Sequence, residues 1–433
     1  MNVNQEGYHR RLDAVQQILQ QYNLKSTNVT PLAYVEHCPF PFNNFIYKVD
    51  LEAPAIPSTF HEQQPCTTTP PTAGVSILVI RMSNPLAEGL NNANRVENDI
   101  ASQQLARQSI QAAGLPPVVP DVYAWAPYRY LDVAGEAGFG WTISEFKLGS
   151  DLNEIFSSLP LDEAISAIQQ LAGIFAAIQN AKLSETVTKF GALSLDGNGN
   201  IVGGQPPLLK GGPWNTYAEF WVAKLQTQLD DADTGSLLRG WREGSLRDRL
   251  DKFIAEGGVD RLLRDVDVDE RTLVHGDLTL NNVLYDSKTK RITAVLDFDW
   301  AAITHPCEEF LTGLWDIGGG IHERNEKFQP MLLSGDFSTQ PDDLPAEDVR
   351  KWEIAKAWDA AIARKGAIRP SQIVGVDRIC ALGELQDLLC PFELANEAML
   401  KRISDKDKLK KKAETEMGIV TWLATYGGAA TVG

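Results

Sequence analysis

The sequence predicts an α+β protein with two lobes. Residues 1–145 are expected to form a small N-terminal lobe, built on an antiparallel sheet with one main helix, and residues 146–433 a large, mostly helical C-terminal lobe. The chain has 433 residues, more than one domain usually contains. Before residue 146 the patterns predict two strands, a helix and two further strands, in that order. After about residue 150 helical periodicity dominates.

Composition narrows the class of protein. Hydrophobic residues make up 43% and charged residues 22% of the chain, which is typical of globular proteins. A formal net charge of −17 disfavours nucleic acid as a partner; acidity fits a cationic substrate, but it more often serves solubility. Five cysteines without C-x-x-C spacing indicate reduced thiols rather than a zinc site. Because neither a secretory signal nor a membrane-spanning run is visible, we expect a soluble, cytoplasmic protein that binds no membrane.

The small lobe begins with an amphipathic helix over residues 8–22. Strands follow at residues 45–49 and 75–82, where apolar and β-branched residues dominate. Residues 52–74 hold five prolines and a threonine run, which favours a mobile loop inserted between these strands.

A helix over residues 95–113 comes next and is stopped by Gly114 and two prolines. Residues 118–125 and 140–146 have the pattern of two further strands. The last of these leads through Glu145 and Phe146 to a glycine, which predicts a hinge between the lobes.

The large lobe is expected to contain helices joined by short connections. Its predicted elements are a buried helix from residue 161, a hairpin at 193–202, helices at 214–229, 246–263, 352–363 and 376–400, and a solvated charged run at 401–412.

One motif in this lobe points to a site. The apolar runs 273–285 and 294–300 are separated by a polar segment, 286–291, and predict an antiparallel hairpin. Since the first strand begins where the second ends, the hairpin brings Asn282 and Asp297 to the same edge. An amide oxygen and a carboxylate, with room left for phosphate and water, suit Mg²⁺. Asp277 has no hairpin partner and is free to face whatever the metal holds.

The motif also carries a family resemblance. His275, Gly276 and Asp277, followed five residues later by Asn282 and then by Asp297 across a hairpin, resemble the aminoglycoside phosphotransferase and choline kinase-like family. That family is a branch of the protein-kinase-like fold. The resemblance implies an ATP-dependent phosphotransferase that moves the γ-phosphoryl group to a hydroxyl of a small molecule, with ATP and Mg²⁺ as cofactors.

The resemblance assigns roles to individual residues. It implies that Asp277 is the catalytic base and that Asn282 and Asp297 hold Mg²⁺, which agrees with the demands of phosphoryl transfer. His275 is interpreted as a support of the loop by packing and hydrogen bonding. For Asp299, contact with a metal and capping of the following segment are equal alternatives.

The small lobe departs from the family in two places. Arg81 stands where the fold usually has a phosphate-binding lysine, and its acidic partner on the next helix is Asp99 or Glu97, with Asp99 favoured by the residues around it. The expected phosphate-covering turn, residues 41–45, has no glycine. Glu145 and Phe146, at the hinge, complete the expected nucleotide site.

Three functions remain open at this level. A small-molecule kinase is the first hypothesis; a catalytically silent kinase-like protein that binds a small molecule or a partner is the second, and non-phosphoryl chemistry in the same cleft the third. The acceptor is expected against the large lobe, lined by helices after Trp300. Acidic side chains there would allow a cationic acceptor: Glu308, Glu309, Asp316, Glu384 and Asp387. ATP and GTP are not distinguished.

Overall fold

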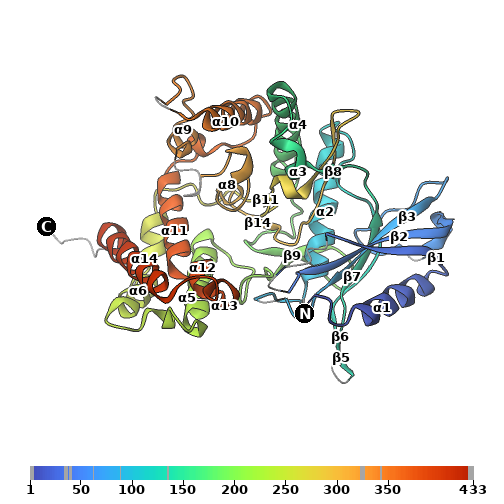
Figure 1. The fold of residues 1–433 in the computed structure, drawn as a ribbon, viewed down its shortest axis with the longest axis horizontal. Helices are drawn as coiled ribbons and strands as arrows, with labels where there is room; N and C mark the ends of the chain where they lie inside the picture. The colour runs from blue at the N-terminus through green and yellow to red at the C-terminus, as the bar shows by residue number, and fades with distance from the viewer. Residues whose placement is uncertain are drawn as a thin grey trace.

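The two lobes lie side by side, with the helix α2 between them (Figure 1). The computed structural model describes residues 4–33, 38, 41–61, 63–87, 89–133, 136–321, 327–341 and 344–427. A twisted antiparallel sheet with the helix α1 forms one lobe, and a helical assembly with short strands forms the other (Figure 1). The expected bilobal α+β fold is therefore confirmed.

The small lobe is built on a five-stranded sheet in which every neighbouring pair is antiparallel. Its strands, in spatial order, are β1 (Ser26–Leu32), β2 (Asn44–Ala55), β3 (Val75–Ser83), β7 (Trp141–Glu145) and β4 (Val122–Ala126). The helix α1 (Tyr8–Gln21) packs on one face, where Leu78, Ile80 and Met82 of β3 are buried. Because side chains alternate along a strand, Arg81 projects from the opposite face.

Several small-lobe elements differ from the predictions. Strand β1 and the separate hairpin of β5 (Arg129–Val133) and β6 (Glu136–Gly138) were not predicted. The predicted insertion is shorter, since β2 continues to Ala55, and it is anchored rather than free. Thr68 N–H donates to Val122 O at 2.8 Å, and the Phe60 ring stacks on Tyr123 at 5.7 Å.

The large lobe surrounds one extensive hydrophobic core. Its helices are α3 (Leu152–Phe156), α4 (Leu161–Gln179), α5 (Tyr217–Thr234), α6 (Leu246–Ala255), α7 (Gly258–Leu263), α8 (Cys307–Thr312), α9 (Gln329–Ser334), α10 (Ala346–Arg364), α11 (Val376–Leu389), α12 (Phe392–Ala395), α13 (Glu397–Leu400) and α14 (Asp405–Tyr426). Its strands are β8 (Ser150–Asp151), β9 (Ala192–Leu195), β10 (Ile201–Gly204), β11 (Thr272–Val274), β12 (Val283–Asp286), β13 (Arg291–Val295) and β14 (Ala302–Thr304).

The helix α4 forms the centre of this core. It is long and apolar enough to cross a membrane by length and composition, yet 61% of its most apolar window is buried inside the protein. Phe175 packs against the rings of Phe310 and Trp358, with ring centroids 5.6 and 5.3 Å apart. These contacts identify α4 as a core helix, as its apolar periodicity predicted.

Two predicted large-lobe helices are interrupted. The helix expected over residues 246–263 is divided into α6 and α7 by Gly257, whose φ of 70° lies outside the helical region. The one expected over 376–400 is divided into α11, α12 and α13 around Pro391. The charged run 401–412 opens α14, whose later part buries Ile419 and Trp422.

The helix α2 (Arg95–Ala112) lies between the lobes (Figure 1). Asn98, on this helix, is fully buried. Its Nδ2 donates to Ala301 O at 2.9 Å, and its Oδ1 accepts from Leu193 N–H at 2.8 Å. The following turns of α2 contribute Ala101 and Leu105 to the core of the large lobe. This helix is therefore attached to the large lobe through both polar and apolar contacts.

Replacing Asn98 tests this attachment. Asn98→Ala leaves a buried carbonyl and a buried N–H without partners, so the free energy of unfolding should fall by about 2–4 kcal/mol. Denaturant unfolding measures the change. Gln108→Ala, at an exposed position of the same helix, should stay within about 0.5 kcal/mol of the wild type. Equal effects of the two substitutions would contradict the bridging role of Asn98.

Candidate active site

The predicted hairpin is present and sets the geometry of the site. Val283 of β12 pairs with Val295 of β13, and Leu296 N–H donates to Asn282 O at 2.9 Å. Asn282, just before β12, and Asp297, just after β13, therefore lie at the same edge of the hairpin, as expected. The first apolar run is not one strand, because the chain leaves β11 after Val274 and crosses a loop before β12.

That loop is held by a buried carboxylate that the sequence did not assign to it. Glu309 of α8 accepts hydrogen bonds from the N–H groups of His275 at 2.5 Å and of Gly276 and Leu278 at 3.4 Å. Burial raises the pKa of Glu309 to about 7, and these three donors offset only part of the effect. At Gly276, φ is 82° and a Cβ atom would lie 2.4 Å from Trp300 O, so the turn requires glycine.

His275 lies beneath the loop and is fully buried. Its Nδ1 accepts from Asp277 N–H at 3.3 Å, its Nε2 is 3.0 Å from Leu296 O, and its ring lies 4.5 Å from the Phe298 ring. Burial lowers the pKa of His275 to about 4, so the ring is neutral near pH 7. A neutral ring that donates through Nε2 satisfies both contacts, which fits a supporting role.

Asp277 is fixed by Asn282. The amide Nδ2 of Asn282 donates to Asp277 O at 2.8 Å and to Asp277 Oδ2 at 2.9 Å. Burial raises the pKa of Asp277 to about 6, the charges of Asp297 and Asp316 add to this rise, and the Asn282 bond opposes it. The carboxyl thus has a proton affinity suited to exchanging a proton near neutral pH.

Arg81 connects the small lobe to the hairpin edge. Its Nη1 lies 2.8 Å from Asp99 Oδ2, and its Nη2 lies 2.7 Å from Asp297 Oδ1 and 2.8 Å from Asp299 Oδ1. Burial alone would lower the pKa of Arg81, but the three carboxylates raise it. Of the two candidate partners on α2, Asp99 makes this ion pair, whereas Glu97 is half-buried and its pKa is raised by partial burial.

A second arginine, which the sequence did not suggest, completes the cluster. Arg95 binds Asp299 through two nitrogens, at 2.6 and 3.3 Å, and it also donates to Asn43 O and Asn44 Oδ1. Asn44 Nδ2 donates in turn to Asp299 Oδ2 at 2.8 Å. Burial alone would raise the pKa of Asp299, but Arg81 and Arg95 hold it at about 2. Asp299 is thus an ion-pair residue rather than a cap.

The expected phosphate-covering turn is part of the same network. Phe42 N–H donates to Asn4 Oδ1 at 2.7 Å, and Asn84 Nδ2 donates to Phe42 O at 2.7 Å. Together with the bonds of Arg95 to Asn43 and Asn44, these side chains shape the turn without glycine.

The hinge residues lie apart from the cluster. The Glu145 carboxylate pairs with Lys147 at 2.8 Å and accepts from Asp121 N–H at 3.2 Å. Phe146 follows at the end of β7, with Lys48 Nζ 5.5 Å from its ring centroid. No contact in the described part of the chain joins either residue to Arg81.

The match to a protein-family model decides the family. The model described as "Phosphotransferase enzyme family" matches residues 92–332, more than half of the chain, from just before α2 to α9. The chain belongs to the phosphotransferase enzyme family. The predicted resemblance is confirmed, and the match includes the loop and the hairpin described above. Membership supports phosphoryl transfer as the class of reaction.

Solved structures are similar at low identity. An APH(4)-Ia aminoglycoside phosphotransferase in complex with AMP-PNP and hygromycin B is 15% identical, with a TM-score of 0.46, 96% of this chain and 99% of that one covered. An APH(2")-IIa complex with streptomycin and ATP is 10% identical, with a TM-score of 0.45, and the match covers 93% of this chain and 97% of that one. An ethanolamine kinase of Plasmodium vivax is 11% identical, with a TM-score of 0.36, and the match covers 91% of this chain and 81% of that one. No curated protein matches the chain.

The donor set at the hairpin edge fits Mg²⁺. Asn282 offers an amide oxygen, and Asp297, whose side chain is 38% exposed, offers a second carboxylate oxygen besides the one paired with Arg81. Among the described residues no group of three or more His, Cys, Asp or Glu side chains could hold a metal ion. A site with two protein oxygens suits a cation that keeps water and phosphate as its other ligands.

A cavity of about 840 Å³ opens beside Asp277. Its walls come from residues 205–210, from α5 and from Trp300, with contributions from α8, α11 and α12. The prediction that helices after Trp300 line the acceptor site is thus incomplete for this cavity, because α5 precedes the motif. No local pattern marks α5 as part of a site.

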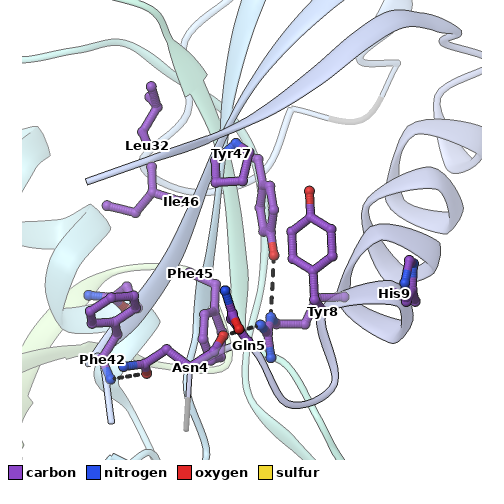
Figure 2. A pocket seen from close by; sticks show the side chains of 12 residues that line it. Asn4, Gln5, Tyr8, His9, Leu32, Phe42, Phe45, Ile46 and Tyr47 are labelled. Carbon is purple, nitrogen blue, oxygen red and sulfur yellow. Dashed lines mark hydrogen bonds between the residues drawn. The ribbon is translucent and has the colours of Figure 1, made fainter. Parts of the chain in front are cut away.

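A second cavity lies in the small lobe, between α1 and the strands β1 and β2 (Figure 2). It measures about 370 Å³ and is lined by side chains of α1, of β1 and β2, and of the segments before them. Tyr8, Phe45 and Tyr47 point into it (Figure 2). The Arg11 guanidinium lies 3.9 Å from the Phe45 ring centroid. No Asp or Glu lines this cavity, and Asp277 does not reach it.

The acidic residues that would attract a cation are mostly occupied. Glu308 is bonded to Tyr217 and Lys224, and Glu309 holds the loop. Asp316 accepts from Leu280 N–H at 2.6 Å. Asp387 and the exposed Glu384 do not line the cavity beside Asp277.

The raised pKa of Glu309 predicts a pH dependence of stability. A carboxyl with a higher pKa in the folded state stabilises the fold at low pH, and this contribution is lost as pH rises through about 7. Between pH 5 and 8 the free energy of unfolding should therefore fall by up to about 3 kcal/mol. Glu309→Gln cannot titrate and should lack this slope. Glu414→Gln, at an exposed position, should keep it, and parallel wild-type and Glu309→Gln curves would contradict the assignment.

Proposed function

We propose that this protein transfers the γ-phosphoryl group of ATP to a hydroxyl group of a small molecule. The observation that carries the proposal is the position of Asp277. Its carboxylate is fixed by Asn282 at 2.9 Å, lines a cavity of about 840 Å³, and stands beside the edge from which Asp297 projects. Family membership supports the class of reaction.

Asp277 acts as the base in this proposal. The acceptor hydroxyl enters from the cavity and donates its hydrogen bond to the Asp277 carboxylate, which orients the oxygen and takes its proton as the bond to phosphorus forms. Asn282 and the loop on Glu309 hold the carboxylate in place. With a pKa near 6, Asp277 is ionised and yet basic at neutral pH.

Asn282 and Asp297 would hold Mg²⁺ at the hairpin edge. The ion, when bound with ATP, neutralises negative charge on the phosphate oxygens. Asp297 reaches this position from a backbone φ of 64°, a left-handed conformation that directs the residue away from the strand course of β13.

In the small lobe, Arg81 is proposed to contact the phosphates in place of a lysine. Asp99 orients its guanidinium, and its planar group can bind phosphate oxygens through two N–H groups. The turn at Phe42–Asn44 would cover the phosphates, and Glu145 with Phe146 would line the adenine side of the cleft. Residues 1–145 would thus bind the nucleotide, and residues 146–433 would supply the metal ligands, the base and the acceptor site.

One observation favours a different function. Arg81 is already engaged by three carboxylates, and the same contacts would stabilise a kinase-like protein that binds no nucleotide. Calorimetry with ATP, with and without Mg²⁺, separates the two. Nucleotide affinity that depends on Mg²⁺ supports the phosphotransferase, and its absence supports a silent binding protein.

Asp277→Asn should abolish transfer and preserve binding. The amide cannot accept the proton, so ATP turnover in the presence of Mg²⁺ should fall about 10²–10⁴-fold, while calorimetric binding of ATP is maintained. In the wild type, kcat/KM should rise with pH up to about 6 and then level, because Asp277 must be ionised. Wild-type turnover by Asp277→Asn would exclude it as the base.

Asp297→Asn should weaken the response to metal. Loss of one of the two protein ligands should raise the Mg²⁺ concentration needed for half-maximal ATP binding by about tenfold or more. Asp286→Asn removes a carboxylate from the opposite end of the same hairpin, where it binds Thr289, and should leave this concentration unchanged. An equal shift in both variants would point to a general charge effect instead.

A further inference from the structure

The cavity beside Asp277 has mainly apolar walls. Its apolar lining residues include Leu90, Pro206, Leu208, Phe220 and Phe392. Leu208 is 48% exposed and Phe392 60% exposed, so both lie at its rim. A cavity of this volume with such walls has the size and polarity typical of sites for molecules with substantial apolar surface.

The charged groups of the cavity nearly balance. Apart from Asp277, its charged lining side chains in the described part of the chain are two carboxylates, Asp231 and Glu308, and two ammonium groups, Lys210 and Lys224. Each ammonium lies close to a carboxylate, since Lys224 binds Glu308 at 2.6 Å and Lys210 binds Asp230 at 3.0 Å. With Asp277 included, the lining therefore carries a net charge of only about −1, which is small for the recognition of a polycation.

The Glu308 carboxylate in particular is not available to a cation. One of its oxygens accepts from Tyr217 OH at 2.6 Å and the other binds Lys224 Nζ at 2.6 Å. The Lys224 ammonium also lies 3.8 Å from the Trp221 ring centroid. All four side chains are buried, so breaking this pair to bind a cationic ligand would leave an uncompensated charge.

The remaining polar groups of the cavity are neutral. Asn91, Gln228, Gln386 and Thr304 line it. The hydroxyl of Thr304 is buried and has no hydrogen-bond partner among the described residues. Because almost none of this oxygen is accessible, the three half-buried amide side chains are neutral polar groups that a bound molecule can reach.

From these observations we infer that the acceptor is an uncharged hydroxyl compound with a large apolar part, rather than a polycation. The inference rests on the proposed function for the identity of the reacting hydroxyl. The apolar part lies against Phe220 and Leu208, the neutral polar groups hold the hydroxyl-bearing part, and one hydroxyl meets Asp277.

A matched pair of probes tests the inference. Octyl β-D-glucopyranoside is uncharged, and octyl 2-amino-2-deoxy-β-D-glucopyranoside differs from it by one ammonium group in place of a hydroxyl. Each is titrated calorimetrically into the full chain below its micellar concentration. The uncharged glycoside should bind about tenfold tighter or better, since the cation loses water in this cavity and the buried Glu308 carboxylate is already paired with Lys224. Equal or tighter binding of the amino glycoside, or no binding of the uncharged one, would overturn the inference.

Leu208→Asp tests whether the glycosides bind in this cavity. A carboxylate at the rim should weaken binding of the uncharged glycoside and strengthen binding of the amino glycoside. The ratio of their dissociation constants should therefore change at least about tenfold in favour of the amino glycoside. Leu409→Asp makes the same change on α14, at a 64% exposed position outside the cavity, and should leave the ratio unchanged. An unchanged ratio in Leu208→Asp would place the glycosides elsewhere and contradict the inference.

Nucleotide measurements keep the two proposals distinguishable. ATP binding and slow hydrolysis are followed with Mg²⁺ and without any glycoside. If they are absent while the glycoside preference is present, the phosphotransferase proposal fails and the selectivity of the cavity stands. If they are present and the preference is absent, the acceptor inference alone fails. A phosphoryl mass gain on the uncharged glycoside would support both.

Discussion

Two guanidinium groups hold together three aspartates that would otherwise repel one another. Asp99 comes from α2, and Asp297 and Asp299 follow β13; Arg81 binds all three, while Arg95 binds Asp299 from the other side. In a largely buried position, each unpaired carboxylate would be costly, so the cluster is stable only as a whole. Through it the sheet of the small lobe, α2, the turn before β2 and the hairpin edge that carries Asp297 are held together in this structure.

This constraint gives a physical reason for arginine at position 81. A lysine ammonium is a compact charge on a flexible stem, whereas a guanidinium directs several N–H groups in one plane. Arg81 uses Nη1 for Asp99 and Nη2 for Asp297 and Asp299. A site with three carboxylates in different directions therefore favours arginine, and the departure from the family pattern is matched by the extra aspartate contact at Asp299.

The sequence was most informative where a pattern is local. The hairpin edge and the central helix follow from spacing and periodicity over a few residues and have the predicted form, whereas the first apolar run is divided between β11, a loop and β12. Strand β1 was missed because it has polar alternate positions and a proline and lies at the sheet edge. The ion-pair partner of Arg95, Asp299, is 204 residues away in the sequence, so no local pattern could predict this pair. One signal did exist, since a cation in the first turn of a helix opposes the helix dipole unless a carboxylate compensates it. The α5 wall of the cavity likewise depends on tertiary packing alone.

The attachment of α2 also determines which parts of the molecule can move together. Asn98 and the apolar side of α2 belong mechanically to the large lobe, although the helix lies between strands of the small lobe in the sequence. If the cleft widens, the sheet must slide over α2, and α2 stays with the body that carries Asp277. The three ion pairs of Arg81, with Asp99, Asp297 and Asp299, then span the moving boundary, so the cleft cannot open without breaking them.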